Sequence, residues 1–251
     1  MTIPTSTLTL REANTIWHER GGWFDAHWHF SFDRYRDPEQ LGVGALRVFN
    51  DDRIIAGAEW PLHPHQDIES LTYVVEGHFL HADSLGNDGR LEAGAAQVMT
   101  FSHRGDEHSE KNGSPDEPLR FIQFWILPST RGLETRVQQR QYTVEDRTDR
   151  WLQIMGPAGT DGLDLAQDAR ALVAHLSDHG RLLHTFESDR GGYLYVIDGR
   201  VEVDGERLAT GDAVKVTGGA ELTLRTGVAA ELILIDVPLR FERIGVWAGE
   251  G

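Results

Sequence analysis

Short runs of apolar and alternating residues, each ended by turn-forming residues, recur along this chain of 251 residues. Runs of five or six residues with period-two alternation or β-branched and aromatic content are typical of strands, and Asn, Asp and Gly clusters are typical of the turns between them. This rhythm predicts an all-β protein built as a sandwich or barrel. The clearest runs are 45–49, 70–75 and 121–126, and the clearest turns are 50–52, 76–77 and 87–89.

The second half of the chain repeats the pattern of the first half. Residues 193–205 are expected to form a strand, a tight turn at Gly199, a second strand and a second turn, and residues 71–79 carry the same order of strand, glycine turn and strand. The turn before Gly94 has a counterpart before Gly211. Two copies of one barrel are therefore predicted.

The join between the two copies is expected between Pro128 and Arg150, where polar residues accumulate. We place the boundary so that residues 1–135 form one domain and residues 136–251 form the other. Helical content should be low, with residues 166–173 as the best candidate for a short helix.

Composition excludes several classes of protein. The 39% of hydrophobic residues suffices for a buried core, so a disordered chain is not expected. The net charge of −16 would repel a phosphate backbone, which argues against direct nucleic-acid binding. The chain contains no cysteine, so it has no disulfide framework, no thiolate metal site and no cysteine nucleophile.

The sequence shows no targeting or membrane signal. The first six residues lack a charged stretch followed by an apolar run, and no stretch approaches the length of about 18 apolar residues that a membrane span needs. The expected location is the cytoplasm.

Two clusters of potential metal ligands are the strongest chemical signal. His63 and His65 are separated by two positions, as are His108 and Glu110. Residues two apart on a strand point to the same side, so two facing strands could offer three imidazoles and one carboxylate. Such a set can hold one divalent transition metal and leave positions open for substrate and oxygen. The pattern predicts a metalloenzyme.

The spacing leaves the identity of the carboxylate open. Glu69 lies at an even offset from His65, so strand parity allows it to face the same way as Glu110 does. Pro64 lacks a backbone donor, which predicts that this segment lies at a strand start or on an irregular edge.

The remaining histidines are weaker candidates. His27 and His29 have ligand spacing but lack a partner pair, so a role in the pocket wall or in packing is expected. His78 and His81 are expected to be structural or solvated. The histidines of the second half lack the two-residue spacing, and the second barrel is predicted to bind no metal; they are His175, His179 and His184.

The chain resembles the cupins, and more narrowly the pirins, on these motifs. The segment from Gly57 to Glu69 is similar to the first cupin motif, and the segment from Gly105 to Asn112 matches the end of the second. Further likenesses to pirins occur at residues 30–32, 45–48 and 83–87. The nearest likeness is to bacterial pirins with quercetin 2,3-dioxygenase activity.

This resemblance implies a bicupin, with two tandem jelly-roll barrels and one metal in the first. It implies that Glu110, rather than Glu69, completes the ligand set, with iron as the first expectation and nickel, manganese, cobalt, copper or zinc as alternatives. The sequence departs from the family at His103 and Arg104, which are expected to alter the rim of the pocket. The implied ligands are His63, His65, His108 and Glu110.

The resemblance also implies an activity: opening of the central ring of flavonols such as quercetin by O2, with release of CO. Glu110 would accept the proton of the 3-hydroxyl group. Aromatic side chains are expected to wall the flat substrate. The candidates for that wall are Trp28, Phe30, Phe49, Phe101 and Phe124.

Other functions remain compatible with the same ligands. Some pirins are regulators that act through protein partners, with the metal's oxidation state changing the surface presented. A metal-dependent isomerase or another small-molecule dioxygenase is a third possibility, because fold and ligands do not fix chemistry. A monomer that binds a small aromatic substrate is the default expectation, with no membrane contact.

Overall fold

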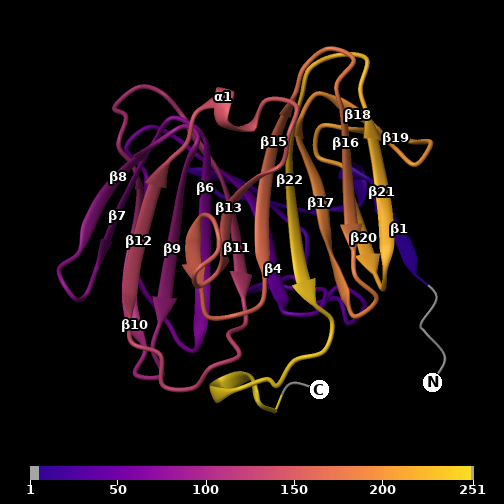
Figure 1. Cartoon of the computed structure of the whole chain (residues 1–251). Helices are drawn as coiled ribbons and strands as arrows, with labels where there is room; N and C mark the ends of the chain where they lie inside the picture. The colour runs from indigo at the N-terminus through magenta and orange to yellow at the C-terminus, as the bar shows by residue number, and fades with distance from the viewer. Residues whose placement is uncertain (1–5, 250–251) are drawn as a thin grey trace.

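The computed structural model describes residues 6–249, which form two β-barrels side by side (Figure 1). The first barrel combines a seven-stranded sheet with a four-stranded sheet. The strands of the larger sheet are, in spatial order, β12 (Arg136–Gln141), β9 (Ala95–Phe101), β6 (Ile68–Glu76), β11 (Leu119–Ile126), β4 (Leu46–Ile54), β3 (Phe24–Trp28) and β2 (Trp17–Arg20). Those of the smaller sheet are β5 (Glu59–His65), β10 (Asp106–Asn112), β7 (His78–Asp83) and β8 (Asp88–Glu92).

The second barrel has the same construction. Its larger sheet contains, in spatial order, β1 (Thr7–Arg11), β20 (Ala213–Thr217), β17 (Arg190–Asp198), β22 (Ala230–Pro238), β15 (Arg170–Leu176), β13 (Leu152–Pro157) and β14 (Leu163–Leu165). Its smaller sheet contains β16 (Arg181–Phe186), β21 (Ala220–Arg225), β18 (Arg200–Val203) and β19 (Glu206–Ala209). The all-β prediction and the prediction of two copies are confirmed.

The repeat extends to the tight turns. Gly77 joins β6 to β7 with φ of 83°, and Gly199 joins β17 to β18 with φ of 88°. Only glycine adopts this backbone conformation without strain. The two glycine turns that the sequence aligned therefore occupy the same place in the two barrels.

Two strands pair across the boundary predicted after residue 135. β12 follows that boundary but pairs with β9 of the first barrel. β1 precedes it but pairs with β20 of the second barrel. Each barrel therefore completes its larger sheet with a strand from the other side of the boundary, and the boundary itself stays a prediction.

Regular helix is scarce in the described part of the chain. The α-helix α1 (Val144–Arg147) begins with a capping box between Thr143 and Asp146, and two 3-10 turns are η1 (Ala13–Thr15) and η2 (Gly245–Trp247). The helix predicted for residues 166–173 is wrong: residues 166–168 form a bend and Arg170 begins strand β15. No helix in the described residues is long and apolar enough to cross a membrane.

The largest hydrophobic core lies between the two barrels. It joins residues of the first sheet, such as Phe49 and Phe124, to residues of the second, such as Tyr193 and Ile235. A separate cluster fills the second barrel around Leu194. The interior of the first barrel is more polar, and there the candidate ligands lie.

Candidate metal centre

The two predicted ligand pairs lie on neighbouring antiparallel strands of the smaller sheet. His63 on β5 pairs directly with His108 on β10, and Glu110 lies opposite Trp60. The register shifts between residues 108 and 110. β5 is the outer strand of its sheet, which confirms the edge position predicted from Pro64.

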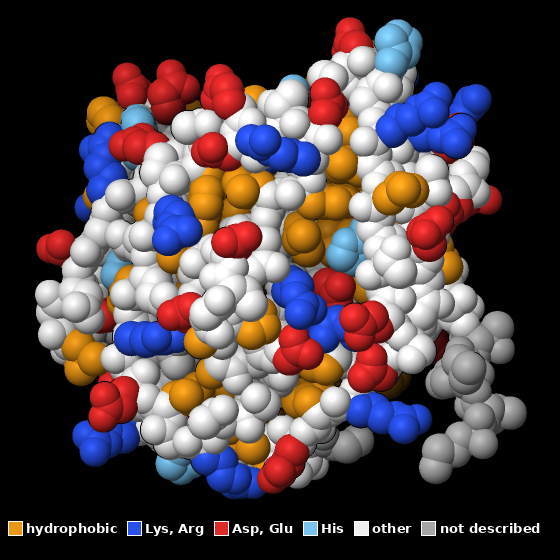
Figure 2. All heavy atoms as spheres, in the orientation of Figure 1, with side chains coloured by type: hydrophobic (Ala, Val, Ile, Leu, Met, Phe, Trp, Pro, Cys, Tyr) orange, Lys and Arg blue, Asp and Glu red, His pale blue; other side chains and the backbone are white. Residues whose placement is uncertain are grey.

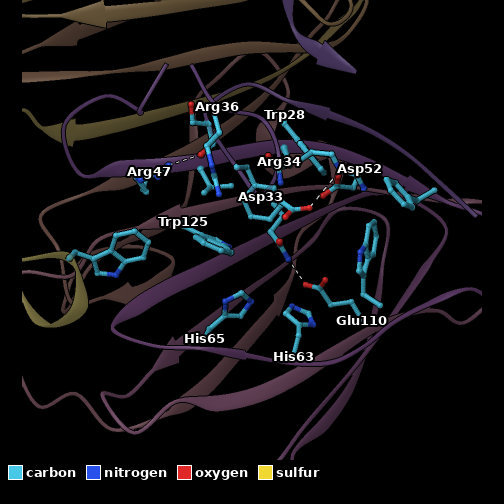
Figure 3. A pocket seen from close by; sticks show the side chains of 18 residues that line it. Trp28, Asp33, Arg34, Arg36, Arg47, Asp52, His63, His65, Glu110 and Trp125 are labelled. Atoms are coloured by element: carbon cyan, nitrogen blue, oxygen red, sulfur yellow. Dashed lines mark hydrogen bonds and ion pairs between the residues drawn. The ribbon is translucent and has the colours of Figure 1, made fainter. Parts of the chain in front are cut away.

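Three imidazoles meet in the interior of the first barrel. One ring nitrogen from each of His63, His65 and His108 can be chosen so that all three lie within 4.8 Å of one another. The ring centroids are 4.5 Å apart for His63 and His108 and 4.8 Å apart for His63 and His65. Figure 3 shows His63 and His65 on the same side of the pocket as Glu110. The sequence spacing predicted this convergence.

The nitrogens of this triad fit a divalent transition metal. Nε2 of His65 and both ring nitrogens of His108 are buried and have no hydrogen-bond partner in the described structure. Nδ1 of His63 lies 2.9 Å from the carbonyl oxygen of Pro61, an acceptor that leaves Nε2 available. Unpartnered buried imidazole nitrogens are costly unless something binds them, and neutral imidazole is a ligand for this class of metal.

Burial favours the neutral form of the His65 and His108 rings. Desolvation lowers the pKa of His65 to about 3, with a further contribution from His63. Desolvation, together with the neighbouring histidines, holds the pKa of His108 well below its ordinary value. Neutral rings retain the lone pairs that a metal needs.

Glu110 lies beside the triad and is fully enclosed. Its carboxyl accepts a hydrogen bond from the side-chain amide of Gln123 on β11. Burial raises the pKa of Glu110 to about 7, against a smaller opposing effect of that hydrogen bond. Its oxygens are not among the atoms within 4.8 Å of one another that define the imidazole group.

Glu69, the rival carboxylate, has other partners. Its side chain is fully buried on β6, and its two oxygens lie 3.0 and 2.9 Å from the backbone nitrogen of Ala166. The Thr100 hydroxyl donates to it at 3.2 Å. Glu69 does not line the cavity next to the histidines, whereas Glu110 does. The geometry therefore favours Glu110 as the fourth ligand.

A cavity of about 630 Å³ opens from the triad. Its aromatic walls come from Phe24, Trp28, Phe32, Trp60, Trp125 and Trp247. Of the aromatic residues expected to form the wall, only Trp28 does so. Phe30, Phe49 and Phe124 belong instead to the core between the barrels, and Phe101 packs against the His65 and His108 rings outside the cavity lining.

Several polar residues of the cavity were missed by sequence reasoning. Asn50 and Asp52 on β4 face the cavity, and one oxygen of each is buried without a hydrogen-bond partner. Burial, then the neighbouring Glu110, holds the pKa of Asp52 well above its ordinary value. Asn50 and Asp52 lie two and four positions after Val48 on β4, so the three side chains point to the same side of the strand. This spacing was the signal in the sequence that could have placed them together. The lining also contains Arg34, Arg36 and Arg47.

His27 and His29, the other histidines with ligand spacing, lie in different surroundings in the structure. His29 is buried between the barrels, with Nδ1 2.7 Å from the Tyr193 hydroxyl, which confirms a packing role. His27 instead stacks on His18 at 4.3 Å and shares a cluster with Asp25. Arg20 donates to Asp25 at 2.8 Å, so a guanidinium already compensates this cluster.

The remaining histidines of the first barrel lie outside the cavity lining. The expectation that His103 and Arg104 shape its rim is wrong, because neither lines the cavity and His103 contacts Asp67 at 2.7 Å. His78 pairs with Glu92 at the hairpin. His81 is buried, and neither of its ring nitrogens has a partner among the described residues, so a solvated His81 is excluded.

The second barrel replaces most of the ligand positions with apolar residues. The strands β16 and β21 take the places of β5 and β10, and His184 pairs with Leu222 as His63 pairs with His108. In this alignment the positions of His63, His65, His108 and Glu110 hold His184, Phe186, Leu222 and Leu224. The prediction that this barrel binds no metal thus has a physical reason.

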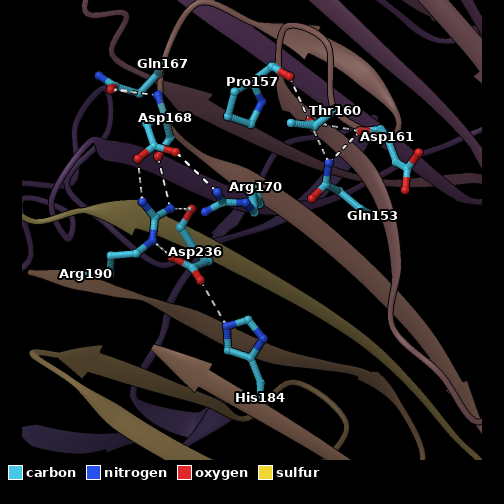
Figure 4. A network of polar contacts seen from close by, with 10 residues as sticks. All are labelled: Gln153, Pro157, Thr160, Asp161, Gln167, Asp168, Arg170, His184, Arg190 and Asp236. Carbon is cyan, nitrogen blue, oxygen red and sulfur yellow. Dashed lines mark hydrogen bonds and ion pairs between the residues drawn. The ribbon is translucent and has the colours of Figure 1, made fainter. Parts of the chain in front are cut away.

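His184 belongs to a network of charges instead (Figure 4). Its Nε2 lies 3.0 Å from Asp236, which accepts a hydrogen bond from Nε of Arg190 at 2.6 Å. Arg190 also donates to Asp168 at 2.8 Å. The buried guanidinium of Arg190 therefore provides a positive charge between Asp236 and Asp168.

Comparison with known proteins places the chain in a family. Residues 10–126 match the sequence model of the Pirin family, and residues 153–237 match that of the quercetinase C-terminal cupin domain. The chain belongs to the pirin family. Like its relatives, this pirin is a bicupin, with one cupin domain in each half.

Two curated relatives illustrate the family. Quercetin 2,3-dioxygenase of Escherichia coli K12 is 36% identical over 231 residues, which cover 91% of this pirin and 98% of the relative. A pirin-like protein of Caulobacter vibrioides is 38% identical over 217 residues, which cover 86% of this chain and 93% of the relative. The similarity therefore extends over both barrels.

A solved structure supports the metal site by analogy. The crystal structure of the bacterial pirin YhhW of Escherichia coli in complex with nickel(II) superposes with a TM-score of 0.86 at 34% identity. The match covers 92% of this pirin and 99% of that chain. Pirins of this fold thus bind a transition metal, whereas the prediction of iron for this chain stays untested.

Proposed function

We propose that this pirin is a metal-dependent dioxygenase that opens the central ring of flavonols such as quercetin with O2 and releases CO. The residues proposed to hold the metal are His63, His65, His108 and Glu110. The observation that carries the proposal is the convergence of three imidazoles, two of them with buried nitrogens that have no hydrogen-bond partner among the described residues, at one end of an aromatic cavity. The name of the Escherichia coli relative agrees with this reaction.

A metal held there supplies a Lewis acid that favours the deprotonated form of an enolic hydroxyl and a centre that can exchange electrons. The protein supplies the base. Glu110 is the group placed to accept the proton of the flavonol 3-hydroxyl, because it lies beside the triad and lines the cavity. Gln123 donates to the Glu110 carboxyl and so fixes its orientation.

The cavity supplies binding and exclusion of water. Trp28 and Trp125 pack on either side of Phe32, at 5.2 and 5.4 Å between ring centroids, and form an apolar wall for a flat ring system. Trp125 also contacts the His65 ring at 4.8 Å, so this wall continues to the triad. A planar aromatic substrate gains both apolar burial and ring contacts in such a place.

The alternative is a redox-responsive regulator that acts through protein partners. A saturated, closed site would favour that function, whereas an open aromatic cavity favours catalysis. The cavity of about 630 Å³ beside the triad therefore supports the enzyme. Fast, metal-dependent oxygen uptake with quercetin would argue against the regulator hypothesis.

Two further proposals are that the protein is a monomer and that it is located in the cytoplasm.

The decisive experiment combines metal analysis with oxygen consumption. Purified protein should contain about one transition metal per chain and should consume O2 when quercetin is added. His63→Ala should lose both the metal and the activity, because it removes one of three nitrogen ligands. His78→Gln is the matched control, since His78 lies on a hairpin away from the cavity and should change neither.

A second variant separates the roles of Glu110. Glu110→Gln keeps the size of the side chain and removes its basicity. We expect flavonol turnover to fall by about 100-fold or more while some metal is retained, as is typical for loss of a general base. An unchanged rate in the metal-loaded variant would refute the proposal that Glu110 is the general base. Complete loss of metal would identify Glu110 as an essential ligand.

A further inference from the structure

The mouth of the metal cavity is positively charged on a protein that is strongly acidic. The net charge of the chain is −16, and Figure 2 shows acidic side chains spread over one face. Yet Arg34, Arg36 and Arg47 all line this cavity, and Asp33 is the one exposed acidic residue in the same lining. The carboxyls of Asp52 and Glu110 lie deeper and are buried. A cluster of like charges against the overall charge focuses the field on a ligand of opposite sign.

The loop that carries Arg34 and Arg36 is ordered. Ser31 lies 2.6 Å from Gln40 through its backbone nitrogen and 2.7 Å from the Asp37 carbonyl through its hydroxyl. Tyr35 is buried and stacks on Trp17 with ring centroids 5.1 Å apart. Tyr35 thus anchors the segment between Arg34 and Arg36, and both of these residues line the cavity. Such preorganisation lowers the entropic cost of binding.

Several hydrogen-bond donors on the arginine side of the cavity lack an acceptor. Arg34 forms ion pairs at 3.4 Å with Glu19 and at 3.9 Å with Asp33, and its side chain is exposed enough to bind a further anion. Arg36 has no hydrogen-bond or ion-pair partner within residues 6–249. Nε1 of Trp125 is buried and has no acceptor. Figure 3 places Trp125 between the arginines and the His65 ring.

Arg47 has a structural role in the same wall. Its Nη1 donates to the Ser31 carbonyl at 2.7 Å, and its guanidinium lies over the Trp247 ring at 5.7 Å. Arg47 therefore ties the arginine loop to the C-terminal turn. Arg34 and Arg36 remain as the exposed arginines of the lining that a ligand can contact.

We propose that the substrate of this pirin carries a carboxylate, bound by Arg34 and Arg36, at the end remote from its metal-binding enol. This inference rests on the proposed function, because it places the enolic end at the histidine triad. It narrows the substrate class from neutral flavonols to acidic enolic aromatics. A guanidinium matches a carboxylate with two parallel hydrogen bonds, which an uncharged flavonol ring cannot provide.

The test compares two ligands that differ only in this charge. The probes are 3-hydroxyflavone and its derivative with a carboxylate on the pendant phenyl ring, titrated into nickel-loaded protein by fluorescence. We expect the wild type to bind the carboxylated probe about tenfold more tightly or better, as charge-assisted hydrogen bonds typically confer. The double variant Arg34→Gln/Arg36→Gln should lose this preference and bind 3-hydroxyflavone as the wild type does.

The matched control is Arg207→Gln, which removes the same charge from an exposed position on β19 of the second barrel. It should keep the full preference for the carboxylated probe. Equal affinity of the wild type for both probes, or an equal loss of preference in the control and the double variant, would overturn the inference. Thermal unfolding verifies that the double variant is folded, which is expected because Arg34 and Arg36 are exposed.

Turnover distinguishes this inference from the proposed function. A preference in affinity that depends on Arg34 and Arg36, without oxygen uptake for either probe, would support the carboxylate site and contradict the dioxygenase. Oxygen uptake without any such preference would support the dioxygenase and contradict the carboxylate site.

Discussion

Two buried glutamates of the first barrel illustrate how neighbours decide the role of a side chain. Glu69 and Glu110 have the same parity relative to the histidines, so sequence spacing could not separate them. The structure gives Glu69 a backbone partner at Ala166 and leaves Glu110 beside the triad. Ala166 lies 97 positions from Glu69 along the chain, so no local pattern announces this hydrogen bond.

Glu69→Gln should stabilise the protein at high pH. Burial raises the pKa of Glu69 from 4.5 to about 7, so the folded state binds this proton more tightly than the unfolded state does. Stability from this group is therefore full below pH 4.5 and is lost as the pH rises through 7. The shift corresponds to about 3 kcal/mol. Glutamine keeps an acceptor for Ala166 and cannot ionise.

Urea unfolding of metal-free wild type and variant, at pH 5 and pH 8, measures the effect. The variant should match the wild type at pH 5 and exceed it at pH 8. Its metal content should be unchanged, because Glu69 is not a proposed ligand. The same pH dependence in both proteins would show that Glu69 is not the titrating group.

The sequence predicted the convergence of the three histidines because the signal for it is local. His63 and His65, and likewise His108 and Glu110, are two residues apart on single strands. The rest of the cavity comes from distant segments: Asn50 and Asp52 face it from β4, as does Arg47, and Arg34 and Arg36 come from the loop before that strand. Those residues look like ordinary polar positions until β4 pairs with β11.

At the level of elements, the two glycine turns are the best-determined feature of the repeat. Replacing Gly77 with Ala would force a Cβ onto the Pro118 carbonyl oxygen, and at Gly199 it would meet that of Ala229. Both positions also have positive φ, which costs an alanine about 1 kcal/mol or more before any clash. Each variant should therefore lose about 2 kcal/mol of unfolding free energy.

Urea unfolding of both variants tests this equivalence. Gly22→Ala is the control, because a Cβ there meets nothing within 4 Å and its φ is not positive. The control should be close to wild type. Full stability of either turn variant would show that the hairpin can reshape and that the glycine is not required.

The false helix over residues 166–173 has the opposite lesson. Its alanines and leucine favour helix by propensity, but the backbone nitrogen of Ala166 is bound by Glu69 and the following residues pair with β22. Tertiary pairing overrides a weak local preference. The real helix at residues 144–147 is a single turn, too short for any periodic signal.

The larger sheets of the two barrels share a core, so we expect the barrels to unfold as one unit. Phe49 of the first sheet packs against Tyr193 and Tyr195 of the second, at 5.2 and 5.3 Å. A buried ion pair strengthens this contact: Arg120 donates to Asp51 at 2.6 Å and to the Ile197 carbonyl at 3.0 Å. One face of each sheet is therefore buried only while the other barrel is folded.

Asp51→Ala tests whether folding is cooperative across this interface. The variant leaves the Arg120 guanidinium buried without its carboxylate and removes the acceptor of the Tyr195 hydroxyl, which lies 2.6 Å from Asp51. Breaking a buried pair in this way typically costs about 3–5 kcal/mol. Calorimetry should show a single transition in both proteins, at a lower temperature in the variant, with equal calorimetric and van't Hoff enthalpies.

Glu242→Ala is the matched control, because it breaks the exposed ion pair between Glu242 and Arg131. Exposed pairs contribute about 0–1 kcal/mol, so its transition should stay close to that of the wild type. Nickel should raise the temperature of the whole transition, since a ligand that binds only the folded first barrel stabilises everything that unfolds with it. Two separate transitions, with only one of them shifted by nickel, would show that the barrels fold independently despite their common core.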